Sequence, residues 1–232
     1  MSDEGKYAVL SDIMCSGPFE GSLWVRGFEQ FMVDMCWNKK FAHTLVDRII
    51  EYDMALWTAQ LNEIGEYVDV VCHGDDLGMQ TWLQLSPAMY REFIKPAHEK
   101  MFSLIHSKTK AKVWLHSCGS VYEIIPDLVE VGVDILNPVQ ASAKNMQLDK
   151  LKKEFGKDIA FWGGSIDIQK LPFMVNLEDV KKMVIDAINI MAPGGGYVFA
   201  GTHNILPETS GEKIYTAYMT AVENRNYSKL KK

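Results

Sequence analysis

Short apolar runs bounded by Gly, Asp or Pro alternate with longer amphipathic segments along most of this chain. Such alternation is typical of β-strands and α-helices arranged around a parallel sheet. Strands are predicted at residues 7–13, 68–72, 112–116, 133–136, 159–162 and 196–200. Helices are predicted at residues 28–35, 41–66, 87–108, 122–131, 148–154, 177–191 and 212–226. The chain is therefore expected to have an α/β fold.

Polar residues gather where the later strands are predicted to end. The loops read Cys72-His73-Gly74-Asp75-Asp76, His116-Ser117-Cys118, Asn137-Pro138-Val139-Gln140, Gly163-Gly164-Ser165-Ile166-Asp167 and Thr202-His203-Asn204. In a parallel (β/α)8 TIM barrel these are the C-terminal ends of strands, where active sites are built. A doubly wound sheet is disfavoured because no G-x-G-x-x-G follows a strand. We therefore expect the five loops to converge on one barrel mouth.

The length is short for a complete barrel of this kind. A full barrel needs eight strands and about 250 residues, whereas this chain has 232 residues and begins almost inside its first predicted strand. We expect an incomplete barrel with about six of the eight β/α units, forming a single domain over residues 1–232. The N-terminal part of a longer parent is expected to be missing.

Composition argues against several classes of partner. The net charge of -6 and the pI near 5.5 give no electrostatic reason to bind nucleic acid or an anionic membrane. The basic cluster at residues 229–232 is expected to be a solvated tail, and no apolar run is long enough to span a bilayer. Four widely spaced cysteines and a start without a secretory segment predict a cytoplasmic protein with reduced thiols.

The segment His116-Ser117-Cys118-Gly119 carries the clearest chemical signal. Two residues at i and i+2 that run off the end of a buried strand can direct an imidazole and a thiolate at one point. Zn²⁺ prefers that ligand pair. The alternative is a hydrogen-bonded core histidine with a small buried cysteine, and for an isolated H-x-C this alternative stays open.

Other titratable residues are assigned structural positions. Cys72 is expected to be a buried strand residue, and His73 to cap its loop. His98 and His106 are predicted to lie on the surface of a helix. Asp75 and Asp76 could form a metal-free acid/base pair, because adjacent carboxylates raise one another's pKa.

Assembled, these loops resemble the C-terminal two-thirds of the uroporphyrinogen decarboxylase superfamily. The resemblance spans residues 66–215, and its motifs are Gly74-Asp75-Asp76-Leu77-Gly78-Met79-Gln80, Tyr90-Arg91-Glu92-Phe93-Ile94-Lys95-Pro96, His116-Ser117-Cys118-Gly119-Ser120, Gly132-Val133-Asp134-Ile135-Leu136-Asn137-Pro138-Val139-Gln140, Phe161-Trp162-Gly163-Gly164, and Gly195-Gly196-Tyr197 through His203-Asn204-Ile205. Each motif alone would be weak, and together they are specific for the superfamily.

The superfamily contains metal-free decarboxylases of a tetrapyrrole and zinc-dependent methyltransferases that use a corrinoid on a partner protein. The H-x-C-G motif resembles the zinc branch, and the arginine-rich segment of the decarboxylases has no counterpart here. Thiol methyltransferases complete their zinc site with a cysteine in the last barrel loop, where this chain has none. The resemblance therefore implies a zinc site of His116, Cys118 and His203 with an open fourth position. Asp75 or Asp76 could add an oxygen ligand or accept an imidazole N–H.

The resemblance implies methyl transfer between a small methylated substrate or thiol and a corrinoid (cobalamin) protein. Asp75, Asp76, Asn137 and Gln140 are the predicted catalytic residues. The residues predicted to contact the corrinoid are Gly163, Gly164, Gly195, Gly196 and Asn204, although glycines 194–196 could equally form a tight turn. One alternative is decarboxylation of a porphyrinogen in tetrapyrrole biosynthesis. Another is a truncated, non-catalytic corrinoid-binding remnant.

Overall fold

The computed structural model describes residues 7–226, so the first residues and the basic cluster at residues 229–232 lie outside the described part of the chain. The chain divides into two compact units. The first unit comprises Met1–Gly78, Leu83–Ser117 and Glu123–Ile135, and the second comprises Met79–Trp82, Cys118–Tyr122 and Leu136–Lys232. The prediction of a single domain over the whole chain stays a prediction.

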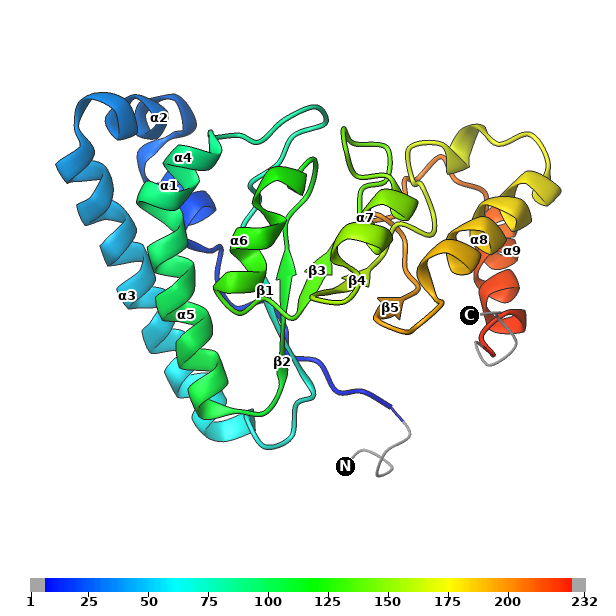
Figure 1. Ribbon diagram of the computed structural model, residues 1–232, viewed down its shortest axis with the longest axis horizontal. Helices are drawn as coiled ribbons and strands as arrows, with labels where there is room; N and C mark the ends of the chain where they lie inside the picture. Colours follow the sequence, from blue (N-terminus) through cyan, green and yellow to red (C-terminus); the bar gives the residue numbers. More distant parts are fainter. Residues whose placement is uncertain (1–6, 227–232) are drawn as a thin grey trace. The chain divides into compact units, whose positions relative to one another are not determined.

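Five strands form a sheet in their sequence order (Figure 1). They are β1 (Val70–Gly74), β2 (Lys112–His116), β3 (Ile135–Asn137), β4 (Ala160–Trp162) and β5 (Tyr197–Val198). Within the first unit β1 and β2 pair in parallel, with Cys72 opposite Trp114. Within the second unit β4 and β5 pair in parallel, with Phe161 opposite Tyr197. The predicted α/β fold with parallel strands is confirmed.

Of the six predicted strands, the first, at residues 7–13, is not formed as a strand. The run lies beside the start of β1, where the Ser11 N–H donates to the Val70 carbonyl and Leu10 makes an isolated parallel bridge to Val70. Ser11 is buried, whereas the large side chains of Tyr7, Leu10 and Ile13 are substantially exposed. An apolar run without a second layer to cover it gains too little from burial to order as a longer strand.

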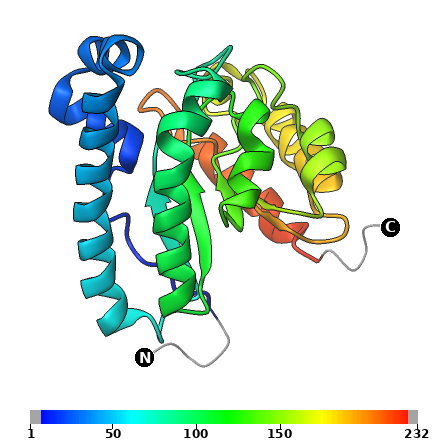
Figure 2. The same ribbon diagram turned by 60° about the vertical axis from the view of Figure 1, so that its left-hand side comes forward.

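Two long helices dominate the first unit. Helix α3 (Lys39–Ile64) and helix α5 (Lys95–Lys108) lie side by side (Figures 1 and 2), and α5 also contacts β2. The core beneath them includes Trp57 and Phe102, both fully buried. The first unit also contains α2 (Phe28–Trp37) and α6 (Ile125–Glu130), and a short 3₁₀ helix, η2 (Tyr122–Ile124), directly precedes α6.

The predicted helix at residues 87–108 is interrupted by a wider turn. It begins as α4 (Pro87–Met89), capped by the Ser86 hydroxyl, which accepts the Met89 N–H at 3.2 Å. A π-helical segment, η1 (Tyr90–Ile94), then leads into α5, and the Lys95 N–H donates to the Tyr90 carbonyl. Pro96 lacks an N–H and its ring crowds the preceding turn, which accounts for the local widening.

Helix α1 (Pro18–Arg26) was not predicted from the sequence. Pro18 occupies the first turn, where its missing N–H costs nothing, and Gly27 separates α1 from α2 at φ 86°. Only nine residues long and containing an internal glycine, this segment lacks the extended periodicity that identifies a helix from sequence.

The second unit holds helices α7 (Leu148–Phe155), η3 (Leu171–Phe173), α8 (Leu177–Met191) and α9 (Gly211–Glu223). Helix α8 has the predicted bounds, because the Asn176 side chain accepts the Asp179 N–H at 2.8 Å and fixes the start. Its apolar face packs against α9. Among residues 7–226, no helix is both long and apolar enough to cross a bilayer.

Candidate functional site

Asp75, immediately after β1, is the centre of a buried polar network in the first unit. Its carboxyl group accepts the N–H of Glu20 at 2.8 Å and that of Phe19 at 3.2 Å. Both donors belong to the first turn of α1, where backbone N–H groups have no partner within the helix. The Nε2 atom of His98 lies 2.9 Å from the same carboxyl group. Asp75 therefore joins the end of β1 to α1 and α5.

Burial controls the protonation of this pair. Desolvation raises the pKa of Asp75 to about 8, although the two backbone N–H groups lower it in part. Desolvation likewise lowers the pKa of His98 to about 3. Near neutral pH the pair therefore shares one proton without net charge, and the Tyr90 hydroxyl completes it at 3.2 Å from Nδ1 of His98.

The expectation that His98 lies on the surface is wrong. Its side chain is fully buried and stacks on Phe102 with ring centroids 5.2 Å apart. His73 is also fully buried, within β1 rather than at a loop cap. Cys72 is buried in β1 and His106 is partly exposed, as predicted.

Asp76 and Glu20 extend this network toward β2. The Asp76 N–H donates to the Glu20 carboxyl group at 3.0 Å, and Oδ1 of Asp76 lies 3.9 Å from Nε2 of His116. Desolvation, together with the nearby carboxylates of Asp76 and Asp75, raises the pKa of Glu20 to about 7, although the Asp76 N–H lowers it in part. Glu20 is therefore partly protonated at neutral pH.

A cavity of about 340 Å³ opens beside these residues within the first unit. It is lined by Ile13, Met14, Cys15, Ser16, Glu20, Trp24, Gly74 and His116. Its volume lies near the lower end of the range for small-molecule pockets, about 300–1,000 Å³. The cavity thus combines apolar walls with one carboxyl group and one imidazole.

The three predicted metal ligands form a group that could hold a metal ion. His116 is the last residue of β2, Cys118 follows two residues later, and His203 lies in the loop after β5. Each offers one ligand atom, and these atoms lie within 4.8 Å of one another. Two imidazoles and a thiolate match the nitrogen and sulfur donors that zinc selects. The donor set therefore fits a zinc ion.

Asn137 and Gln140 make structural contacts within the second unit. The Asn137 amide donates to the carbonyl of Trp162 at 3.2 Å. The Gln140 side chain accepts the Gly119 N–H at 2.9 Å and donates to the Gln80 side chain at 2.7 Å. Gln140 thereby anchors the residue that directly follows Cys118.

The predicted cofactor-binding glycines fall into two classes. Gly163 and Gly164 have φ of 105° and 79°, and a Cβ on Gly164 would lie 2.9 Å from the Val139 carbonyl oxygen. Close backbone packing therefore explains this pair. Gly195 and Gly196 lie in an exposed turn, and a Cβ on Gly195 would meet nothing within 4 Å. Asn204 is exposed beside His203.

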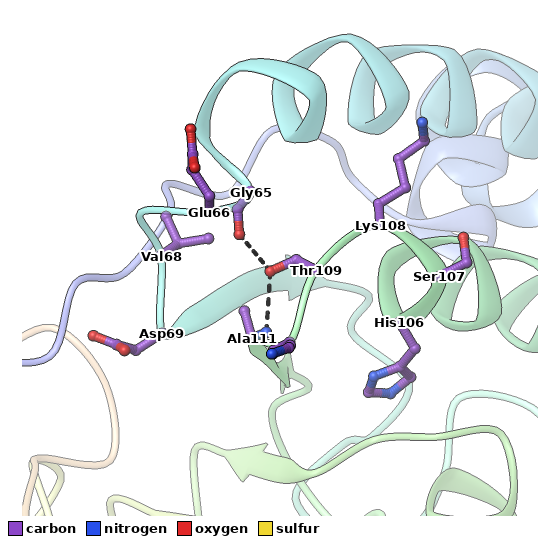
Figure 3. Close-up of a pocket in the computed structure, with 10 residues that line it drawn as sticks. Gly65, Glu66, Val68, Asp69, His106, Ser107, Lys108, Thr109 and Ala111 are labelled. Atoms are coloured by element: carbon purple, nitrogen blue, oxygen red, sulfur yellow. Dashed lines mark hydrogen bonds between the residues drawn. The ribbon is translucent and has the colours of Figure 1, made fainter.

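A second hollow, of about 620 Å³, lies at the opposite end of β1 and β2 (Figure 3). There the Thr109 hydroxyl donates to the Gly65 carbonyl and accepts the Ala111 N–H. These bonds close the connection into β2. The N-terminal ends of barrel strands serve stability, so this hollow is not the candidate site.

Sequence reasoning missed Glu20, Tyr90 and the role of His98. His98 shares a helical face with Ile94, Met101 and Ile105, so the apolar spacing of the helix could have indicated its burial. No local signal marks Glu20, because its partner is the N–H of a residue 56 positions away.

Comparisons with known proteins give one family and several structures. The family model described as "Uroporphyrinogen decarboxylase (URO-D)" matches residues 13–224. A methyltransferase from Methanosarcina mazei superposes with a TM-score of 0.68 at 20% identity, covering 90% of this chain and 57% of that one. A Xanthomonas albilineans dihydropteroate synthase superposes with a TM-score of 0.46 at 13% identity, covering 78% of this chain and 62% of that one. No curated protein matches the sequence significantly.

These matches bear on the fold. The predicted α/β fold is confirmed by the five-stranded sheet and by the superposition on the Methanosarcina mazei methyltransferase. A complete barrel has eight strands, so five strands are consistent with the expected incomplete barrel. The chain spans 57% of the length of the Methanosarcina mazei methyltransferase.

Proposed function

Because this chain belongs to the uroporphyrinogen decarboxylase family, we propose that it is a zinc-dependent methyltransferase. It moves a methyl group between a small methylated substrate or thiol and a corrinoid held by a partner protein. The observation that carries this proposal is the group of His116, Cys118 and His203. Three protein ligands leave a fourth position for substrate, as in catalytic zinc sites.

Zinc held by these residues would supply Lewis acidity, which favours thiolate formation at neutral pH and improves a methyl-carrying oxygen as a leaving group. The chain's own residues orient the ligands. Asp76 lies close enough to His116 to bias the orientation of its imidazole. Gln140 fixes the backbone at Gly119 and so restrains the loop that carries Cys118.

Asn137 and Asn204 are proposed to hydrogen-bond a polar group of the substrate. Asp75 is proposed to act through α1 rather than on the substrate, since it is fully buried. Gly195 and Gly196 directly precede β5, at the N-terminal end of that strand, so they are proposed to form the tight turn into β5 rather than to touch the corrinoid. Gly163 and Gly164 are proposed to shape the loop rather than to touch the corrinoid.

Metal content tests the proposal most directly. We expect about one zinc per chain by mass spectrometry in protein purified without chelator. His116→Ala, Cys118→Ser and His203→Ala should each lose it, whereas His43→Ala, at an exposed histidine on α3, should retain it. Correctly folded protein without zinc would overturn the mechanism.

Activity is then measured as loss of methyl from a methylated corrinoid in the presence of thiols, followed by the change in corrinoid absorbance. Zinc-loaded protein that transfers no methyl to or from any corrinoid would also contradict the proposal. In that case porphyrinogen decarboxylation and a non-catalytic remnant are the alternatives, which decarboxylase assays separate.

A further inference from the structure

The 340 Å³ cavity of the first unit contains a carboxyl group without a counter-charge. One oxygen of Glu20 accepts the Asp76 N–H, and the other has no hydrogen-bond partner among residues 7–226. No lysine, arginine or histidine of the described chain forms an ion pair with Glu20. Half-buried carboxylates are ordinarily paired, because desolvation of an unpaired charge is costly.

The surrounding charges are also negative. The carboxylates that act on Glu20 are those of Asp75 and Asp76, and both disfavour its ionisation. An anionic ligand in this cavity would therefore be repelled by the carboxylates of Glu20 and Asp76. A cationic ligand would supply the missing counter-charge.

The walls of the cavity suit a particular kind of cation. Trp24, whose exposed fraction is 73%, offers an indole ring, and Met14 and Ile13 offer apolar surface. An ammonium group surrounded by methyl or methylene groups is attracted to the face of an indole and loses little hydration when it contacts apolar walls.

We propose that this cavity binds the ammonium end of a small cationic substrate, with Glu20 as its counter-charge and Trp24 as its aromatic wall. Glu20 is then a residue that determines specificity. His116 lines the same cavity, so the reactive end of the ligand lies beside a proposed zinc ligand. Binding of the cation does not depend on the proposed function. Only the reaction of the bound ligand rests on the proposed zinc-dependent methyl transfer.

The test compares three ligands of the same shape and different charge. Choline, 3,3-dimethyl-1-butanol and 3,3-dimethylbutanoate are titrated into the full chain at pH 8 and low salt, where Glu20 is mostly ionised, and binding is followed by NMR. We expect choline to bind about tenfold more tightly than the neutral alcohol, and the carboxylate not to bind.

Variants show whether the cavity is responsible. Glu20→Gln keeps an oxygen for the Asp76 N–H and should abolish the preference for choline. Trp24→Leu, at an exposed position that should not affect folding, should weaken choline more than the alcohol. Glu63→Gln makes the same charge change at an exposed residue without a hydrogen-bond partner and should leave binding unchanged.

Several outcomes would overturn the inference. They are no binding of any ligand at millimolar concentration, equal binding of choline and the alcohol, tighter binding of the carboxylate, or a choline preference that persists in Glu20→Gln. Zinc content is measured on the same samples. If the wild-type chain holds zinc but shows no preference for choline, only this inference is refuted. If the wild-type chain prefers choline but holds no zinc, only the proposed function is refuted.

Discussion

Replacement of His98 by leucine should destabilise the protein more than most single substitutions. Leucine preserves apolar contact with Phe102 but removes the imidazole partner of the Asp75 carboxyl group, which keeps its two backbone N–H donors, and leaves the Tyr90 hydroxyl without its partner. All three side chains are fully buried, so water cannot replace the lost bonds. Each lost hydrogen bond of a buried polar group costs about 1–3 kcal/mol, and the substitution removes two such bonds from an uncharged network. We expect the free energy of unfolding to fall by about 2–6 kcal/mol.

A double-mutant cycle separates the hydrogen-bond network from side-chain volume. Tyr90→Phe alone orphans Nδ1 of His98 and should cost about 1–3 kcal/mol. In the His98→Leu background the Tyr90 hydroxyl is already without a partner, so its removal should cost little or restore stability. The two losses should therefore fall short of additivity by about 1–3 kcal/mol.

The measurement is urea unfolding at pH 7, followed by tryptophan fluorescence and far-UV circular dichroism. His106→Leu is the matched control on the same helix, since His106 is partly exposed and its one carbonyl bond can be replaced by water. A loss below about 1 kcal/mol in His98→Leu, or strict additivity with Tyr90→Phe, would refute the network.

Two further predictions concern Asp75 and Gly164. Burial raises the pKa of Asp75 from 3.8 to about 8, so its contribution to stability is complete below about pH 4 and is lost as the pH rises to about 8. Between pH 6.5 and 8 the wild type should therefore lose about 2 kcal/mol more than Asp75→Asn in urea unfolding, and parallel profiles would contradict the shift. Gly164→Ala should lower the free energy of unfolding by about 2–4 kcal/mol, because the alanine would adopt a positive φ and its Cβ would overlap with Val139. The control Gly194→Ala, at φ 78° in open space, should lose only the smaller contribution from φ. Equal losses in the two variants would disprove the close approach of Gly164 to Val139.

Regular elements with strong local signals were predictable from the sequence. Strand β2 corresponds to a short apolar run, and α8 begins at an Asn cap and has a clear amphipathic pattern. Local rules failed where tertiary contacts decide. The run at residues 7–13 is apolar but leaves its large side chains exposed. Helix α1 depends on Asp75, more than 50 residues away, to accept its first N–H groups.

The candidate site divides in the same way. His116 and Cys118 follow from their spacing at the end of a strand, whereas His203 entered only through the resemblance to a family. Glu20 could not be recognised, because its importance comes from an unpaired oxygen in a cavity built by several segments. A sequence reports residue types and spacing, but it does not report which carboxyl groups lack a counter-charge.

The π-helical segment at Tyr90–Ile94 has a geometric consequence. Eight residues of regular α-helix turn through about 800°, which would leave Tyr90 and His98 about 80° apart around the axis. The wider segment turns less per residue and removes most of that angle, so the phenol can reach the imidazole. The extra residue in the wider segment thus gives residues eight positions apart the relative orientation that residues seven positions apart have in a regular α-helix. The π-helical segment therefore places Tyr90 and His98 on the same side of the helix, where their side chains can form a hydrogen bond.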